Sequence, residues 1–92
     1  GQSESPLFHA DLIQSMHKAL RGAGFGEVAT LHFPQCTYPS GWWSATMGSK
    51  AGSLAAASQS NAPVPFPTRY YNRAIHAAAL ASPEFLRQKL LK

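Results

Sequence analysis

Two stretches of alternating side chains constrain the fold most strongly. Residues 28–33 and residues 42–49 each place hydrophobic and polar side chains on alternate sides, which is typical of β-strands. The connection at residues 34–41 contains two prolines and a glycine and is too long for a two-residue turn. We therefore predict an antiparallel hairpin whose loop has a fixed path, and such loops often carry functional side chains. In the first strand Ala29, Leu31 and Phe33 share one face, and in the second Trp43, Ala45 and Met47 share one face.

Helical spacing dominates the chain before the hairpin. Hydrophobic residues recur every three or four positions over residues 7–21, and Gly22, Gly24 and Gly26 follow as a stop signal. The pattern predicts a helix with its core face formed by Phe8, Leu12, Ile13, Met16, Ala19, Leu20 and Ala23. The opposite, solvent-facing side is predicted to hold Asp11, Gln14, His17, Lys18 and Arg21.

Two shorter helices are predicted after the hairpin. Asn72 is a good N-cap for a helix that carries Ile75, and Ser82-Pro83-Glu84 predicts the start of a last helix. That helix is predicted to bury Phe85, Leu86 and Leu90. Residues 51–67, rich in Ala, Ser, Gly and Pro, are predicted to form a linker-like surface loop.

Composition limits the partners and the compartment. The net charge is +4, but the eight Lys and Arg are scattered along the 92 residues, so nucleic-acid binding is weakly supported. Cys36 is the single cysteine and cannot form an internal disulfide, which favours a cytoplasmic setting. No apolar run approaches the ~20 residues that span a bilayer, so we expect no membrane partner.

One hairpin is a poor basis for an independent domain. A two-stranded sheet is marginally stable unless it lies against more sheet. A helix followed by a final antiparallel hairpin suits the closing portion of a doubly wound α/β sheet. We therefore expect the chain to be cut from something larger, with parallel strands upstream.

Several short strings, in this order, resemble the C-terminal half of the polyamine aminopropyltransferases, the spermidine synthase family. They are Gln2-Ser3-Glu4-Ser5, Thr37-Tyr38-Pro39-Ser40-Gly41-Trp42-Trp43, Arg69-Tyr70-Tyr71-Asn72 and Ile75-His76. The resemblance implies an α/β fold: the C-terminal portion of a Rossmann-like S-adenosylmethionine-dependent methyltransferase fold, with a helix, an antiparallel hairpin and two C-terminal helices. Residues 1–92 would then be the C-terminal part of a catalytic domain whose nucleotide-binding half is absent here.

The same resemblance implies a function. In this family a diamine such as putrescine attacks the aminopropyl carbon of decarboxylated S-adenosylmethionine, without a metal or other cofactor. Gln2, Tyr38 and Trp43 match the positions that line the amine pocket, while the chain holds no catalytic or nucleotide-binding residue. The implied partners are the N-terminal half of the same enzyme, the diamine, and further copies in a homodimer or higher oligomer. The chain alone is expected to be inactive.

Other interpretations stay open at this point. Gln2 can be a plain strand-end residue, Tyr38 a turn residue and one of the two tryptophans part of the core. Tyr70, Tyr71 and His76 fit packing and capping better than catalysis. A metal site or a Cys36 nucleophile with His32 as its base has little support, because neither ligand spacing nor an orienting group is evident. From another class, the chain can be a non-catalytic basic module that binds or completes a partner protein.

Overall fold

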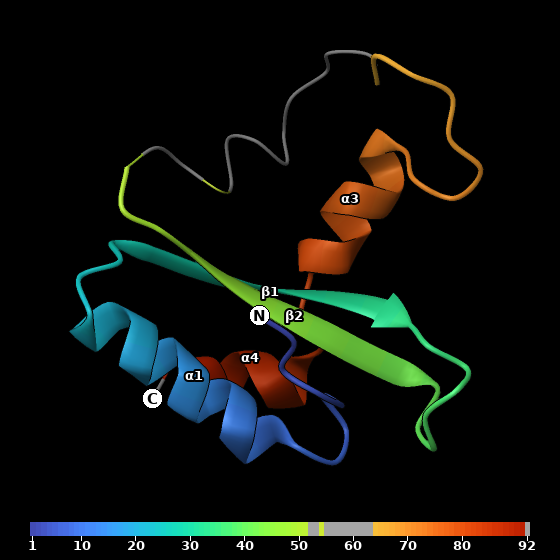
Figure 1. The fold of residues 1–92 in the computed structure, drawn as a ribbon. Helices are drawn as coiled ribbons and strands as arrows, with labels where there is room; N and C mark the ends of the chain where they lie inside the picture. Colours follow the sequence, from blue (N-terminus) through green and yellow to red (C-terminus); the bar gives the residue numbers. More distant parts are fainter. Residues whose placement is uncertain (52–53, 55–63, 92) are drawn as a thin grey trace.

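The structure, a computed structural model, describes residues 1–51, 54 and 64–91. Helix α1 (Ala10–Gly22) precedes strands β1 (Glu27–Pro34) and β2 (Trp42–Ser49), and helices α3 (Arg73–Leu80) and α4 (Glu84–Leu90) follow them (Figure 1). The predicted helix, hairpin and two later helices are therefore confirmed. The predicted linker at 51–67 lies largely outside the described residues.

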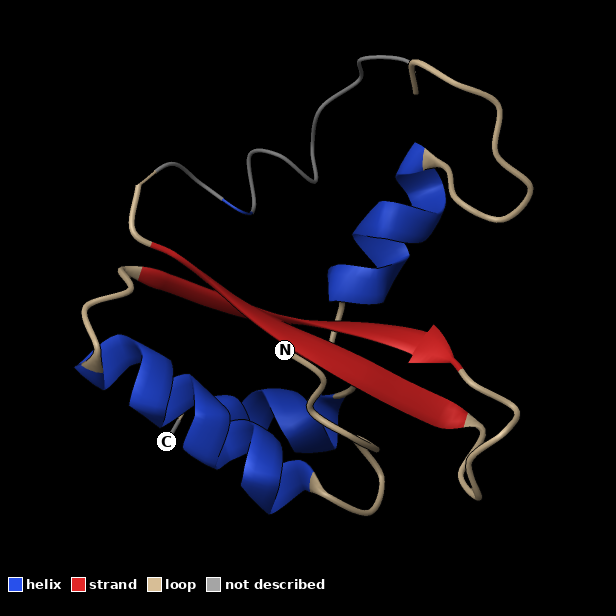
Figure 2. Ribbon diagram, in the orientation of Figure 1, coloured by secondary structure: helices blue, strands red, loops and turns tan. Residues whose placement is uncertain are grey.

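The two strands form the predicted antiparallel hairpin, and the N-terminal segment extends it. β1 and β2 are antiparallel, from Glu27 opposite Ser49 to Pro34 opposite Trp42. Gln2 forms a bridge with Ala45, and the Ser3 N–H donates to the Ser44 carbonyl at 3.0 Å. Residues 1–3 thus lie along the edge of β2 that β1 leaves free, and Figure 2 shows the N-terminus beside the hairpin.

Helices lie on two sides of the hairpin. α1 packs on both strands and on α4, whereas α3 contacts β1 on the other side (Figure 1). Ile13 of α1 and Leu86 of α4 are the hydrophobic side chains with an exposed fraction of 0% among the described residues. None of the described helices has the length and apolar character that crossing a membrane requires.

The layer between α1 and the hairpin is largely polar. The side chains buried there and beside it are Ser3, Ser5, His17, Thr30, His32, Ser44 and Thr46. The prediction that His17 faces solvent is wrong: its exposed fraction is 4%, because its Nε2 lies 2.6 Å from Thr30 Oγ1. Phe8, Leu12, Ala19 and Ala23, predicted in the core, are exposed. Phe8 lies in the turn before α1, and the strands meet α1 with hydroxyl groups rather than with an apolar surface.

Two helix starts differ from the predictions. α1 begins at Ala10 rather than at residue 7, because Ser5 Oγ accepts from the N–H groups of Leu7 and Phe8 and forms a separate turn. α4 has Pro83 as its N-cap, and the Pro83 carbonyl accepts the first N–H groups of the helix, so the predicted Ser82 cap is wrong. The two helices still form because their packing faces, rather than their caps, hold them.

The remaining helix predictions have mixed outcomes. The predicted Asn72 cap is confirmed, with its Oδ1 accepting from the Ile75 N–H at 2.8 Å. Leu86 is buried as expected, but Leu90 is only half-buried and Phe85 is exposed over about half of its surface. Phe85 instead meets the ring of Trp42 edge-on, at 6.3 Å between centroids.

Candidate functional site

The hairpin loop forms a bend closed by three backbone hydrogen bonds. The Tyr38 N–H donates to the Gln35 carbonyl at 3.3 Å, and the Gly41 N–H donates to the Tyr38 carbonyl at 2.9 Å. The Gln35 N–H donates to the Gly41 carbonyl at 2.9 Å. Gly41 has φ of 67°, a left-handed conformation that favours glycine. Together these contacts hold Tyr38 at the tip of the hairpin.

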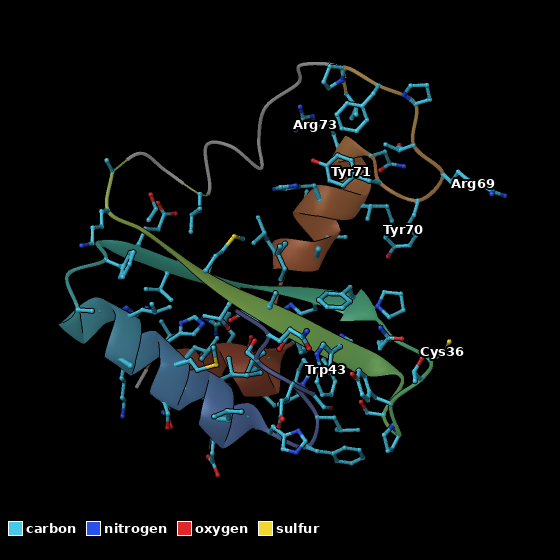
Figure 3. All side chains as sticks on the ribbon, viewed as in Figure 1. Cys36, Trp43, Arg69, Tyr70, Tyr71 and Arg73 are labelled. Carbon is cyan, nitrogen blue, oxygen red and sulfur yellow. The ribbon has the colours of Figure 1, made fainter. Side chains whose placement is uncertain are left out.

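The three predicted amine-site residues form one contiguous cluster. The rings of Tyr38 and Trp43 stack with centroids 4.1 Å apart and planes 21° apart. Trp43 Nε1–H donates to Gln2 Oε1 at 3.0 Å. An indole N–H can only donate, so this bond orients the Gln2 amide with its oxygen toward Trp43. We call Gln2, Tyr38 and Trp43 the amide–aromatic cluster. Figure 3 shows Trp43 at the loop end of the hairpin.

Sheet geometry explains why these residues meet. Gln2 lies opposite Ala45 on the edge of β2, and Trp43 is two residues from Ala45, so their side chains share one face. Trp42 points to the other face, where its ring lies 5.6 Å from that of His32. The prediction that the two tryptophans face opposite sides is thus confirmed. Besides stacking on Tyr38, Trp43 hydrogen-bonds Gln2.

The cluster presents groups suited to an alkyl chain that ends in an amine. Tyr38 has an exposed fraction of 40%, and no hydrogen bond from the described residues engages its hydroxyl. The Gln2 amide oxygen keeps one lone pair after accepting from Trp43. Aromatic faces contact methylene groups and also attract cations through their quadrupole. The cluster can therefore bind an alkylammonium group.

The cluster itself contains no carboxylate to act as a base. The nearest acid along the chain, Glu4, lies 3.5 Å from His9 Nδ1. Asp11 pairs with Lys89, which lowers the pKa of Asp11. Hydrogen bonds from Arg87 and then Gln88 lower the pKa of Glu84 to about 2. Within residues 1–51, 54 and 64–91, then, these acids are engaged elsewhere.

Two cavities beside α3 are separate from the cluster. The larger, of about 450 Å³, lies between α3 and the end of the hairpin, and the smaller has about 140 Å³. Their lining includes His32, Phe33, Tyr70, Ile75 and Ala79. The amide–aromatic cluster is therefore an exposed surface rather than a wall of these cavities.

The other sequence-based candidates are not part of the amide–aromatic cluster. Tyr71 Oη lies 2.9 Å from His76 Nδ1, close to the start of α3, where Figure 3 shows Tyr70 and Tyr71. His32 is buried and hydrogen-bonds the Ala79 carbonyl, whereas Cys36 is exposed on the loop. His32 is thus not presented to Cys36 as a base. The part of the chain that the structure describes holds no group of three metal-ligating side chains.

Sequence reasoning missed the serine pairs that join the segments of the cluster residues. Ser5 Oγ donates to Ser40 Oγ at 2.9 Å, and Ser3 Oγ lies 2.7 Å from Ser44 Oγ. Their signal in the sequence is that Ser3, Ser5 and Ser40 belong to the same two strings as Gln2 and Tyr38. Nothing in the sequence, however, indicates which serines pair.

Comparison with known proteins gives one consistent result. The chain is 55% identical over 91 residues to the polyamine aminopropyltransferase of Thioalkalivibrio sulfidiphilus, covering 97% of this chain and 32% of that protein. It is 57% identical over 84 residues to the polyamine aminopropyltransferase of Methylococcus capsulatus, covering 91% of this chain and 30% of that protein. The chain thus spans about a third of the length of these curated relatives. No family model matches it.

Solved structures agree on the fold. The spermidine synthase of Thermotoga maritima superposes with a TM-score of 0.71 at 24% identity, over 97% of this chain and 31% of that one. A spermidine synthase in complex with the transition-state analogue AdoDATO gives the same TM-score. The expected α/β fold, a portion of the spermidine synthase fold, is confirmed.

Proposed function

We propose that this chain belongs to the polyamine aminopropyltransferase family, whose curated members it matches over about a third of their length. We propose further that it forms the amine-binding part of a spermidine synthase. In the proposed reaction a diamine nitrogen attacks the aminopropyl carbon of decarboxylated S-adenosylmethionine. The carbon–sulfur bond breaks, methylthioadenosine leaves, and the amine loses a proton to a base. A sulfonium is a sufficient leaving group, so the proposed reaction uses no metal or other cofactor.

The amide–aromatic cluster is the observation on which the proposal depends. Gln2 comes from the edge segment, Tyr38 from the hairpin loop and Trp43 from β2, and they meet within hydrogen-bonding and stacking distance. Such a surface supplies an acceptor for an ammonium and an aromatic contact for methylene groups. In a displacement without a covalent intermediate, this orientation of the amine contributes much of the rate.

We propose that the rest of the site lies outside these 92 residues. The cluster contains no carboxylate to act as a base, and we propose that the base and the nucleotide site come from elsewhere in the enzyme. We propose that the N-terminal part of the same enzyme supplies the base and the nucleotide site. We also propose that the enzyme forms a homodimer or higher oligomer. The exposed, unpaired Cys36 fits the cytoplasmic setting that we propose.

The test uses the full-length enzyme that contains these residues. Methylthioadenosine release is measured with decarboxylated S-adenosylmethionine and putrescine, for the wild type and for Trp43→Phe. Phenylalanine keeps an aromatic ring but cannot donate to Gln2. We expect Trp43→Phe to raise the KM for putrescine about tenfold, the effect of one lost hydrogen bond to a positioned group.

A matched control is Trp42→Phe, which alters the aromatic group on the opposite face. We expect its KM for putrescine to stay within about twofold of the wild type. A wild-type enzyme that releases no methylthioadenosine with any diamine, while binding an unrelated protein tightly, would contradict the proposal and favour a non-catalytic module.

A further inference from the structure

One side-chain hydrogen bond joins the two segments that carry Gln2 and Tyr38. Ser5 follows Gln2 by three residues, and Ser40 follows Tyr38 by two. Ser5 Oγ donates to Ser40 Oγ at 2.9 Å, and Ser5 has an exposed fraction of 1%. Water does not compete for the buried Ser5 hydroxyl, so this bond holds its geometry better than a fully exposed one, although Ser40 is half-buried.

The direction of this bond follows from its neighbours. Ser40 Oγ lies 2.8 Å from the Trp42 carbonyl oxygen, which can only accept, so Ser40 donates there. Ser40 then accepts the proton of Ser5, and Ser5 itself accepts from the N–H groups of Leu7 and Phe8. Each of the two hydroxyl groups therefore donates one assigned hydrogen bond and accepts at least one other. Neither can rotate without breaking a hydrogen bond.

The edge segment reaches Ser40 through a strained residue. Glu4 has φ of 64°, which is rare for a residue other than glycine, and it lies between the edge pairing of Ser3 and the bond of Ser5. Its carbonyl oxygen accepts from Ser44 Oγ at 2.7 Å, which ties the turn to β2. The chain thus leaves the sheet edge sharply at Glu4 and brings Ser5 to the hairpin loop.

We propose that Ser5 and Ser40 are positioning residues that set the separation of Gln2 from Tyr38, and thereby the length of diamine that the site prefers. This inference rests on the proposed function. The Gln2 amide meets the N–H at the edge of the Trp43 ring, and the Tyr38 ring stacks on its face, so a shift of the loop relative to the edge segment changes the span between amide and phenol. Two substrates that differ by one methylene group can differ about 10- to 200-fold in kcat/KM when the residues that line the pocket are fixed, and less when those residues are mobile.

The experiment compares diamines of four and five carbons in the full-length enzyme. We expect Ser40→Ala to lower the ratio of their kcat/KM values about fivefold, while the KM for decarboxylated S-adenosylmethionine stays within about twofold. Ser40→Thr keeps the hydroxyl and should restore the ratio. Ser15→Ala, an exposed position on α1, is the matched control and should leave it unchanged.

A double variant separates positioning from general destabilisation. Because Ser5 and Ser40 act through one bond, Ser5→Ala combined with Ser40→Ala should lower the ratio no further than Ser40→Ala alone. A merely structural role would lower the active fraction equally for both diamines and leave the ratio intact.

An unchanged ratio in Ser40→Ala, in an enzyme that is active with putrescine, overturns the positioning role and leaves the proposed function standing. A wild-type enzyme that uses no diamine overturns both. Since Ser40 is half-buried, its variant tests the inference even if Ser5→Ala does not fold.

Discussion

At the scale of single residues, one carbonyl assigns the protons of a whole buried chain of hydrogen bonds. The Glu4 carbonyl can only accept, so Ser44 donates to it, and each preceding group must in turn donate to the next. The chain runs in order through His17, Thr30, Thr46, Ser3 and Ser44 to Glu4. His17 therefore carries its proton on Nε2. Its Nδ1 has no partner among the described residues, as a neutral ring allows.

This assignment predicts how His17 titrates. Burial, and to a lesser extent the charge of Arg21, lower the pKa of His17 below its ordinary 6.5. Nitrogen chemical shifts from NMR of the folded protein should show the Nε2–H tautomer at pH 6.5 and protonation only at lower pH. A ring that is half protonated at pH 6.5 would contradict the lowered pKa of His17, and a neutral ring that carries its proton on Nδ1 would contradict the assigned chain.

The same shift affects stability. Below pH 6.5 the His17 side chain binds a proton in the unfolded state but not in the folded state. The free energy of unfolding should therefore decrease as the pH is lowered, by at most about 1.4 kcal/mol per pH unit for His17. This decrease ends at the pKa that His17 has in the folded state. His17→Gln keeps a donor for Thr30 but removes this titration, and should leave only the part due to His32, whose pKa burial also lowers.

At the scale of elements, β2 depends on a residue with no side chain. A Cβ added at Gly48 would lie 2.9 Å from Phe25 Cγ and 3.1 Å from Phe25 Cβ. The Phe25 ring thus packs directly on the strand backbone, with Lys50 Nζ 5.2 Å from its centre. The connection between α1 and β1 is held to the hairpin by this contact.

We predict that Gly48→Ala destabilises the protein by about 1 to 3 kcal/mol, because the Phe25 ring must move away from the strand. The free energy of unfolding in denaturant is the measurement. Gly22→Ala, at the end of α1 where an added Cβ meets nothing within 4 Å, should be neutral or slightly stabilising. Equal effects of the two changes would show that the Phe25 contact is not formed.

At the scale of the whole molecule, α4 connects the end of the chain to α1. Leu86 is fully buried, Gln14 Nε2 donates to the Lys89 carbonyl at 2.8 Å, and Lys89 pairs with Asp11. The ion pair is exposed on the Asp11 side and contributes little. Burial of Leu86 is therefore the main contribution to the docking of α4.

Leu86→Ala should lower the free energy of unfolding by about 2 to 5 kcal/mol, through lost burial and the cavity left behind. Leu91→Ala removes the same atoms at a position that is 74% exposed. It should change the free energy of unfolding by no more than about 0.5 kcal/mol. A loss at Leu91 as large as that at Leu86 would show that α4 packs differently.

Local patterns were enough to predict the elements and two of their details. Alternation predicted both strands and the opposite faces of Trp42 and Trp43, and helical spacing predicted α1, because these signals depend only on neighbours along the chain. The Asn72 cap is local in the same way. The membership of Gln2, Tyr38 and Trp43 in one site was suggested by resemblance rather than by pattern.

Long-range contacts decided the rest. His17 was expected in solvent, but a hydroxyl on β1 offers its ring a partner that no periodicity reveals. The bond from Trp43 to Gln2 and the pairing of Ser5 with Ser40 each join segments that meet only when the edge segment lies along β2. The stacking of Tyr38 on Trp43 depends in turn on the path of the hairpin loop. Hydrogen bonds between distant residues depend on the position of whole elements, so only the folded chain specifies them.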